Sequence, residues 1–174
     1  EVEGATGTLL VGNNDQLIEI TKANYKTVET AEFTNNRPIG GLKITKNVTV
    51  DDKPAAGAKI NLADGTYTFK IYEDATLATL AKDADGKEIG DVNVVIVDGK
   101  SETVEVNNLL VGKYYVHEVE GANGTLLVGD NNDQLIEITK TNYAQPETAR
   151  VAPHLPLGGL KIEKNVTVDD KPAA

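Results

Sequence analysis

Residues 40–50 read GGLKITKNVTV, and this stretch alternates between apolar and polar side chains. Its even positions from residue 42 onward are Leu42, Ile44, Lys46, Val48 and Val50, while polar residues occupy most of the odd positions. Because successive side chains of a β-strand point to opposite faces, a period of two predicts a strand with one buried face. Lys46 is the exception in this pattern, because it places an amine on the apolar face.

The rest of the chain has the same short alternating segments, separated by Gly, Asn and Asp-Gly turns. One such turn, Asp98-Gly99, has the composition of a two-residue hairpin. Only residues 75–82, ATLATLAK, have the composition of a short helix. The further predicted strands are TYTFKIY (66–72), DVNVVIV (91–97), SETVEV (101–106), GKYYVHEVE (112–120) and QLIEITK (134–140). Many short strands joined by turns predict an all-β fold, an antiparallel β-sandwich.

The chain repeats itself. Residues 1–56 reappear as residues 118–174 with one inserted residue, Asp130, and 43 of the 56 aligned positions are identical. The repeat unit is therefore about 118 residues long, and Pro followed by Gly-Gly marks its boundary twice. This predicts three pieces: the C-terminal part of one repeat (1–39), a complete β-sandwich repeat (40–157) and the N-terminal strand of a following repeat (158–174). A near-identical tandem array is typical of a spacer or stalk.

Composition excludes several classes of function. The formal charge of −10 is opposite to that of a nucleic-acid-binding surface, and no apolar run is long enough to insert into a membrane. The absence of Cys excludes disulfides and thiolate metal sites, and two His residues leave little for a metal centre. We therefore expect no nucleic-acid partner, no metal and no cofactor.

Two further polar side chains lie in phase with apolar ones. Glu118 shares a face with the apolar residues of GKYYVHEVE, and Asn35 shares one with those of AEFTNN (31–36). If these faces are buried, burial favours the neutral forms of Lys46 and Glu118. Two plainer interpretations stay open. The strands can have solvated polar ends at the rim of the sandwich, or Lys46 and Glu118 can form a buried ion pair with no covalent chemistry.

Three segments together, GGLKITK (40–46), GKYYVHE (112–118) and AEFTNN, resemble the isopeptide-forming, Cna-B-like domains of Gram-positive surface adhesins and pilins. The resemblance implies an immunoglobulin-like sandwich in which a first-strand Lys attacks the side-chain amide of a last-strand Asn. It further implies that Lys46 is the nucleophile and Glu118 the proton shuttle. The product would be an amide crosslink, formed once with loss of ammonia.

The acceptor of this crosslink is open in the sequence. The first copy has Asn35 at the matching position, whereas the complete repeat has Pro153, which has no side-chain amide. Asn142 is the nearest other candidate in the complete repeat, and a complete repeat with no bond is the alternative. The equivalents of Glu118 and Lys46 in the partial repeats are Glu1 and Lys164. Segment 1–39 could also exchange into a second copy of the chain and bring Asn35 to that copy's Lys46.

These observations predict a structural spacer repeat of an extracellular, cell-wall-associated adhesin or pilus-like protein, with neighbouring repeats of the same chain as its partners. The alternative is a ligand-binding adhesin module whose loops recognise a host matrix protein or a glycan. An enzyme with turnover is not expected, because the sequence offers no nucleophile–base–metal set besides Lys46 and Glu118.

Overall fold

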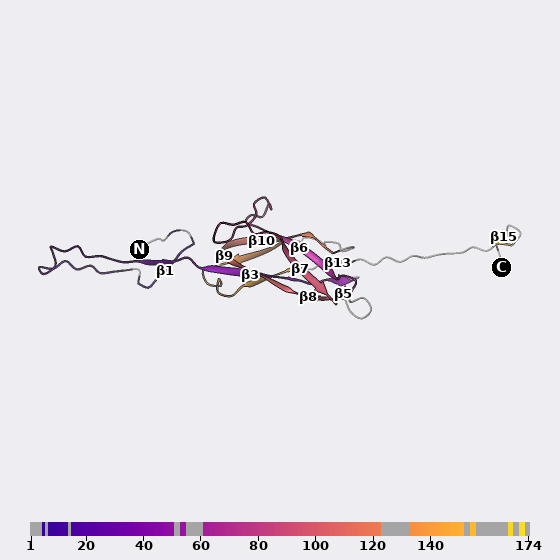
Figure 1. The fold of residues 1–174 in the computed structure, drawn as a ribbon, viewed down its shortest axis with the longest axis horizontal. Coiled ribbons are helices and arrows are strands. Elements are labelled where there is room, and N and C mark those ends of the chain that lie inside the picture. The colour runs from indigo at the N-terminus through magenta and orange to yellow at the C-terminus, as the bar shows by residue number, and fades with distance from the viewer. Residues whose placement is uncertain are drawn as a thin grey trace.

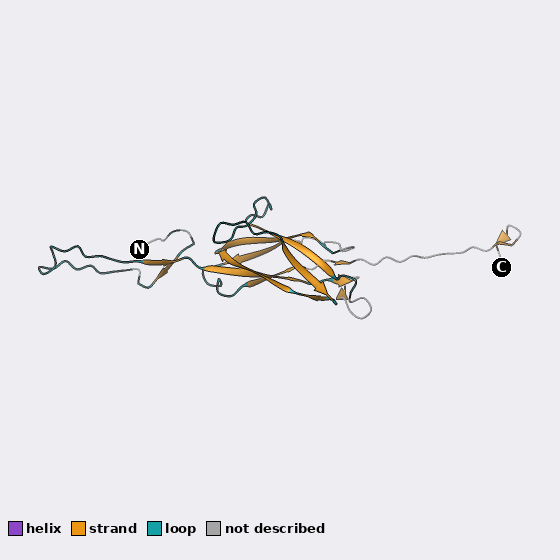
Figure 2. Cartoon of the chain, viewed as in Figure 1, coloured by secondary structure: helices purple, strands orange, loops and turns teal. Residues whose placement is uncertain are grey.

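The computed structural model describes residues 5, 7–13, 15–50, 53–54, 61–122, 133–151, 154–155, 167–168 and 171–172 of the 174-residue chain. Among these residues the chain forms strands and turns but no helix (Figure 2). The strands are β1 (Leu9–Val11), β2 (Thr34–Asn36), β3 (Ile39–Lys46), β4 (Thr49–Val50), β5 (Lys53–Pro54), β6 (Gly65–Tyr72), β7 (Val92–Val97), β8 (Lys100–Ser101), β9 (Thr103–Leu110), β10 (Gly112–Glu120), β11 (Asp133–Ile138), β12 (Glu147–Val151), β13 (His154–Leu155), β14 (Thr167–Val168) and β15 (Lys171–Pro172).

Two sheets pack face to face and enclose the core, as Figure 1 shows. One sheet has the order β11-β10-β6-β7-β8, and the other has the order β12-β3-β9. A small third sheet, β13-β4-β5, lies beyond the end of β3 along the chain. The core cluster draws buried side chains from both large sheets: Leu42, Ile44, Tyr67, Phe69, Ile71, Ala81, Val92, Val94, Ile96, Leu109, Tyr114, Val116, Ile136, Ile138 and Ala149. The chain is therefore an all-β sandwich, which confirms the fold class predicted from the sequence.

The alternation in β3 has the predicted outcome. Leu42, Ile44 and Lys46 are buried, while Lys43 and Thr45 are partly exposed on the other face. Lys43 forms an ion pair with Glu105 of β9, with 2.7 Å between Nζ and Oε1. One face of the strand therefore points into the sandwich and the other toward solvent, as a period of two requires.

Strand β12 departs from the antiparallel expectation. It runs parallel to β3, with Glu147 opposite Leu42 and Val151 opposite Lys46. The same direction continues into the small sheet, where His154 of β13 pairs with Thr49 of β4. Alternation does not encode strand direction, so the sequence pattern gave no sign of this parallel pair. Its consequence is that the last strand of the sandwich passes the Lys46 end of the first.

The helix expected over residues 75–82 is wrong. The Asp74 carboxylate accepts hydrogen bonds from the backbone N–H groups of Thr76, Ala78 and Thr79, which fold the segment into a tight turn. The Thr76 hydroxyl also donates to this carboxylate, and this bond, together with the backbone ones, holds the pKa of Asp74 down to about 2. Leu77 has a φ of 56°, which a helix does not allow. An Asp side chain that binds nearby backbone N–H groups competes directly with helix formation.

Most of the segment before β3 extends away from the sandwich, although Nζ of Lys140 donates a hydrogen bond to the Thr8 carbonyl at 2.7 Å. Its strands β1 and β2 pair with each other, and the chain between them extends away from the two large sheets (Figure 1). In the part of the chain that the structure describes, no helix is long and apolar enough to cross a membrane.

Candidate functional site: a buried lysine–glutamate pair

Lys46 ends β3 with its side chain inside the sandwich. Only 1% of the residue is exposed, although a lysine is almost never fully buried unless it is paired. The neighbouring strand on one side, β12, places Val151 opposite Lys46. The backbone N–H of Lys46 donates a hydrogen bond to Oγ of Ser101, 3.1 Å away, which fixes the end of β3.

Glu118 reaches the same point from the other sheet. It lies in β10 opposite Phe69 of β6, where the register shifts between Glu118 and Glu120. Glu118 is fully buried, and its Oε2 accepts a hydrogen bond from Nζ of Lys46. Its other oxygen, Oε1, has no hydrogen-bond partner among the described residues. The pair thus joins the two sheets and retains one buried acceptor atom that a further donor could satisfy.

Two aromatic rings flank the lysine amine. Nζ of Lys46 is 4.7 Å from the centroid of the Tyr67 ring and 5.5 Å from that of Phe69. The Tyr67 hydroxyl turns elsewhere and donates to the carbonyl of Ala63, at 2.8 Å. The rings attract a cation through their faces, but they also replace the water that would otherwise solvate the amine.

Burial shifts the pKa values of Lys46 and Glu118 in the directions that favour the neutral form of each side chain. Desolvation lowers the pKa of Lys46 to about 8, and the hydrogen bond and charge of Glu118 only partly oppose this. Desolvation likewise raises the pKa of Glu118, again partly opposed by Lys46. Because the two values approach each other, proton transfer from the ammonium to the carboxylate is much less costly here than in water.

The arrangement suits one kind of reaction, attack of a neutral amine on a carbonyl carbon. A deprotonated Lys46 is a nucleophile, and a protonated Glu118 can polarise the carbonyl and protonate a leaving nitrogen. The same geometry also fits a buried ion pair that performs no chemistry. What separates the two is whether a carboxamide reaches Nζ.

Asn142 lies in the turn that follows β11 and is held there by its own hydrogen bonds. Its Oδ1 accepts from the backbone N–H of Thr139 at 2.6 Å, and its Nδ2 donates to the Glu147 carboxylate at 2.7 Å. Glu147 is opposite Leu42 in the β12–β3 register, four residues or about 13 Å along β3 from Lys46. The geometry therefore does not support Asn142 as the acceptor, because its amide organises a turn at the other end of the strand.

The remaining sequence-predicted positions divide into two groups. Asn35 lies in β2, exposed and opposite Leu10 of β1, and so is separate from the sandwich. Pro153, Glu1 and Lys164 lie outside the described residues. Of the described residues near it in the sequence, Val151 is opposite Lys46 and His154 is opposite Thr49.

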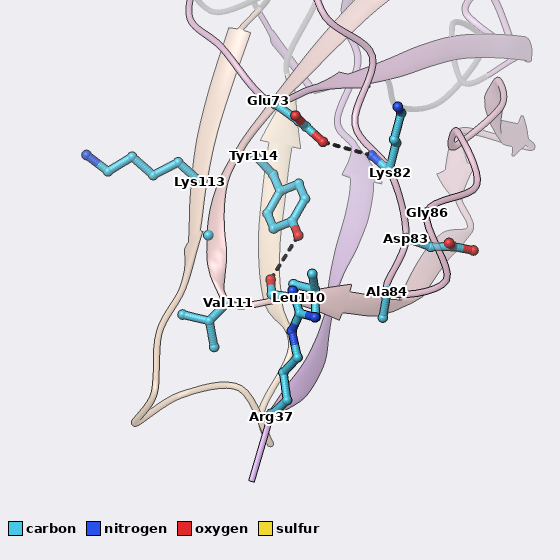
Figure 3. A pocket seen from close by; sticks show the side chains of 11 residues that line it. Arg37, Glu73, Lys82, Asp83, Ala84, Gly86, Leu110, Val111, Lys113 and Tyr114 are labelled. Carbon is cyan, nitrogen blue, oxygen red and sulfur yellow. Dashed lines mark hydrogen bonds between the residues drawn. The ribbon is translucent and has the colours of Figure 1, made fainter. Parts of the chain in front are cut away.

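Two hollows border the sandwich. One, of about 660 Å³, lies at the end of β3 and is lined by Thr45, Lys46, Asn47, Val48, Thr49, Gly99, Lys100 and Ser101. The other, of about 460 Å³, lies between Arg37 and Tyr114 (Figure 3). In it the Tyr114 hydroxyl donates to the Leu110 carbonyl at 2.8 Å, and burial raises the pKa of Tyr114. The lining of this second hollow mixes both signs of charge, so it indicates no particular ligand.

The described residues contain no group of three His, Cys, Asp or Glu side chains that could hold a metal ion.

Comparison with solved structures finds bacterial pilins and adhesins at low sequence identity. In fold, the chain resembles pilins and adhesins. It is similar to a streptococcal ancillary pilin, with 18% identity and a TM-score of 0.44 over 89% of this chain and 40% of that one. It is also similar to the minor pilin GBS52 of Streptococcus agalactiae, with 19% identity and a TM-score of 0.42 over 73% of this chain and 48% of the pilin.

A third similar structure is an adhesin from Mobiluncus mulieris that contains intramolecular disulfide, isopeptide and ester bond cross-links. Its identity is 15% and its TM-score 0.39, over 75% of this chain and 46% of the adhesin. The chain spans less than half the length of each of these three proteins. No family model and no curated protein matches it. The similar structures belong to the class that the sequence motifs suggested.

Sequence reasoning missed the surroundings of the amine. The alternation of TYTFKIY placed Tyr67 and Phe69 on one face, but nothing in it indicated that this face covers Lys46. The role of Ser101 at the end of β3 was also missed, because it depends on the sheet pairing. A useful signal was available only in part: a buried amine requires apolar side chains around it, and Tyr67 and Phe69 are large side chains in phase on one strand of the repeat.

Proposed function

We propose that the chain is a structural repeat of an extracellular, cell-wall-associated fibre, an adhesin stalk or pilus-like protein, and that Lys46, assisted by Glu118, can form an amide crosslink with an Asn side chain placed beside it. The observation that carries the proposal is the fully buried pair joining the two sheets, with one Glu118 oxygen left without a donor in the described structure. A solvated rim position would leave both side chains exposed, so that plainer interpretation is not supported.

The crosslink balances as an amide exchange. Neutral Nζ of Lys46 attacks Cγ of an Asn carboxamide, and the bond from Cγ to Nδ2 breaks. Glu118 gives its proton to the leaving nitrogen and takes one from Nζ, so ammonia departs and the carboxyl is regenerated. The contact supplied by the fold replaces the activation that an amide otherwise needs. The reaction occurs once per site, so it is self-processing and not enzymatic turnover.

The position that supplies the carboxamide is, in this proposal, the one that Pro153 occupies in the complete repeat. In the sequence this position is two residues after Val151, which is opposite Lys46. The first copy has Asn35 at the matching position. A bond from this strand to Lys46 would connect the first and last strands of the sandwich. Tension applied to the ends of the unit would then pass through covalent bonds, and the strands between would be shielded from it.

The near-identity of the repeats also favours a spacer over a binding module. Binding loops are where related domains usually differ, whereas here most differences between the copies fall within residues 26–39 and their counterparts. The partners in this proposal are therefore neighbouring repeats and other subunits of the same fibre. A host ligand recognised by the loops stays the alternative.

The proposal is tested by restoring the carboxamide. Intact-mass spectrometry of the Pro153→Asn variant should show the loss of one ammonia molecule relative to the mass calculated from its sequence. The matched control, Lys46→Met in the same variant, should show the calculated mass. An unshifted mass in folded Pro153→Asn would overturn the crosslinking role of the pair.

A further inference from the structure

Strand β3 loses its antiparallel backbone partner at the residue that carries the buried amine. The register between β3 and β9 ends at Thr45 and Thr103. The residue before Thr103, Glu102, has already crossed to the other sheet, where its backbone N–H donates to the carbonyl of Val95 at 3.1 Å. The backbone N–H of Lys46 therefore lies beyond the last registered pair of β3 and β9, and it needs an acceptor from elsewhere.

Ser101 supplies that acceptor. It lies in β8, the edge strand of the five-stranded sheet, opposite Ile96 of β7. Its Oγ accepts the hydrogen bond from the backbone N–H of Lys46 at 3.1 Å and donates one to the carbonyl of Glu102 at 2.8 Å. Because the hydroxyl proton is directed to Glu102, a lone pair of the oxygen faces Lys46. One serine side chain thus ties the end of β3 to the opposite sheet.

The same serine lines the hollow of about 660 Å³ at the end of β3. This hollow has room for many water molecules, since one water occupies about 30 Å³ of the liquid. Lys46 also contributes to the lining, yet its side chain is 0% exposed. The part of Lys46 that faces the hollow is therefore its backbone, and Ser101 binds that backbone.

We infer that Ser101 is a positioning residue for the crosslinking reaction: its hydroxyl fixes the backbone of Lys46, so that the amine stays against Glu118 and away from solvent in the hollow. The inference deepens the proposed function and rests on the crosslinking role of the pair. Because Ser101 contacts the backbone of Lys46, it acts through that residue and takes no part in the proton transfers.

The position of the amine matters because desolvation is the main cause of its low pKa, about 8 against an ordinary 10.5. Water that reached Nζ would solvate the ammonium and raise the pKa of Lys46 again. Proton transfer from Lys46 to Glu118 depends on the difference between their two pKa values. Each unit by which the pKa of Lys46 rises therefore lowers the fraction of the neutral pair, and with it the crosslinking rate, about tenfold. A displaced strand end lowers the rate further, because the amine must stay within reach of the carbonyl carbon.

The test compares two substitutions that differ by one hydroxyl group. Ser101→Thr keeps an acceptor for the backbone N–H of Lys46, whereas Ser101→Val has nearly the shape of threonine and no acceptor. Both are made in the whole Pro153→Asn chain, and the loss of ammonia is followed by intact-mass spectrometry after a pulse of cell-free synthesis. Ser101→Thr should react at nearly the rate of Pro153→Asn alone, and Ser101→Val should react at least about tenfold more slowly.

A second measurement does not depend on the reaction. In the chain with Pro153 unchanged, ¹³C-labelled lysine is titrated by NMR, and Lys46 is assigned by the signal that disappears in Lys46→Met. Ser101→Thr should keep the Lys46 midpoint near 8, and Ser101→Val should move it toward 10.5. The matched control is Thr103→Val, which removes the exposed hydroxyl contact between Thr45 and Thr103 at the same end of β3. It should leave both the midpoint and the crosslinking rate unchanged.

Two results would overturn the inference: a folded Ser101→Val that titrates and reacts like Ser101→Thr, and a Thr103→Val that slows the reaction as much as Ser101→Val. Ser101→Ala removes the hydroxyl without added bulk, and it takes the place of Ser101→Val if circular dichroism shows that the latter does not fold. If Pro153→Asn reacts equally fast in both Ser101 backgrounds, the role of Ser101 is refuted and the proposed function stands. If Pro153→Asn never loses ammonia, the proposed function fails, and the lysine titration still decides whether Ser101 positions the amine.

Discussion

Removing the Glu118 carboxylate should destabilise the sandwich by about 3–5 kcal/mol at pH 7, the range for breaking a buried ion pair from one side. In Glu118→Ala, Nζ of Lys46 loses the acceptor that the structure gives it. The amine then still faces the rings of Tyr67 and Phe69, whose centroids are 4.7 and 5.5 Å from Nζ. An ammonium in that setting must either stay charged and poorly solvated or lose its proton.

The free energy needed to deprotonate Lys46 sets an upper limit on how much Glu118→Ala can destabilise the sandwich. The ordinary pKa of lysine, 10.5, lies 3.5 units above pH 7, and each unit corresponds to about 1.4 kcal/mol. Neutralising Lys46 in the folded state therefore costs at most about 5 kcal/mol. Glu118→Gln should cost less than Glu118→Ala, because its amide oxygen can still accept from Nζ. Replacing both residues, as in Lys46→Met with Glu118→Leu, should be nearly neutral or stabilising.

Urea denaturation followed by circular dichroism measures these differences. With a slope of about 1–3 kcal/mol per molar urea, the expected loss moves the midpoint by at least about 1 M. The reasoning is refuted if Glu118→Ala loses less than about 1 kcal/mol. It is also refuted if the double replacement is as unstable as Glu118→Ala, since the two side chains would then not be coupled.

The remaining predictions concern pH, the restored acceptor and the repeat itself. Burial lowers the pKa of Lys46 to about 8, so between pH 8 and 10.5 the unfolded chain binds the proton that the folded chain has released. The free energy of unfolding should therefore rise with pH in that window, and urea titrations at pH 8 and 10 should show no such rise in Lys46→Met. The crosslinked Pro153→Asn variant closes a loop of about 100 residues, so thermal unfolding should show a gain of up to about 4–5 kcal/mol over its Lys46→Met control. Ile138→Ala should cost about 2–5 kcal/mol and Ile20→Ala less than about 0.5, by the same denaturation assay, although both Ile residues lie in the same heptapeptide. Equal costs would contradict the burial of one and the exposure of the other.

The position of Lys46 and Glu118 on the apolar faces of their strands could be predicted from the sequence because it depends on a period of two. Alternation assigns every second side chain of a strand to one face, whatever its partner strand is. Alternation alone left a solvated position at the rim open, and the burial of both side chains in the sandwich of Figure 1 decides against it. The repeat could also be found from the sequence, because it requires only that the chain be compared with itself.

What could not be predicted depends on pairing between distant strands. The parallel alignment of β12 with β3 and the register shift after Glu118 leave no local mark in the sequence. Asn142 was a reasonable acceptor candidate by residue type. Its amide is instead used by the backbone of its own turn, which only the hydrogen-bond geometry shows. The helix expected at 75–82 failed similarly, because Asp74 binds the N–H groups that a helix would need.

The differences between the two copies bear on why the pair is present in a repeat that has Pro153 at the position matching Asn35. Lys46 and Glu118 are matched by Lys164 and Glu1, whereas Asn35 is matched by Pro153. A buried ion pair is generally no more stabilising than apolar side chains of similar volume, so stability alone gives no reason to keep it. In the complete repeat the pair retains an unpartnered carboxylate oxygen in the described structure. In Pro153→Asn, an Asn carboxamide at the matching position would offer a donor to this oxygen and a carbonyl carbon to Lys46, so the crosslinking role of the pair predicts that this variant reacts.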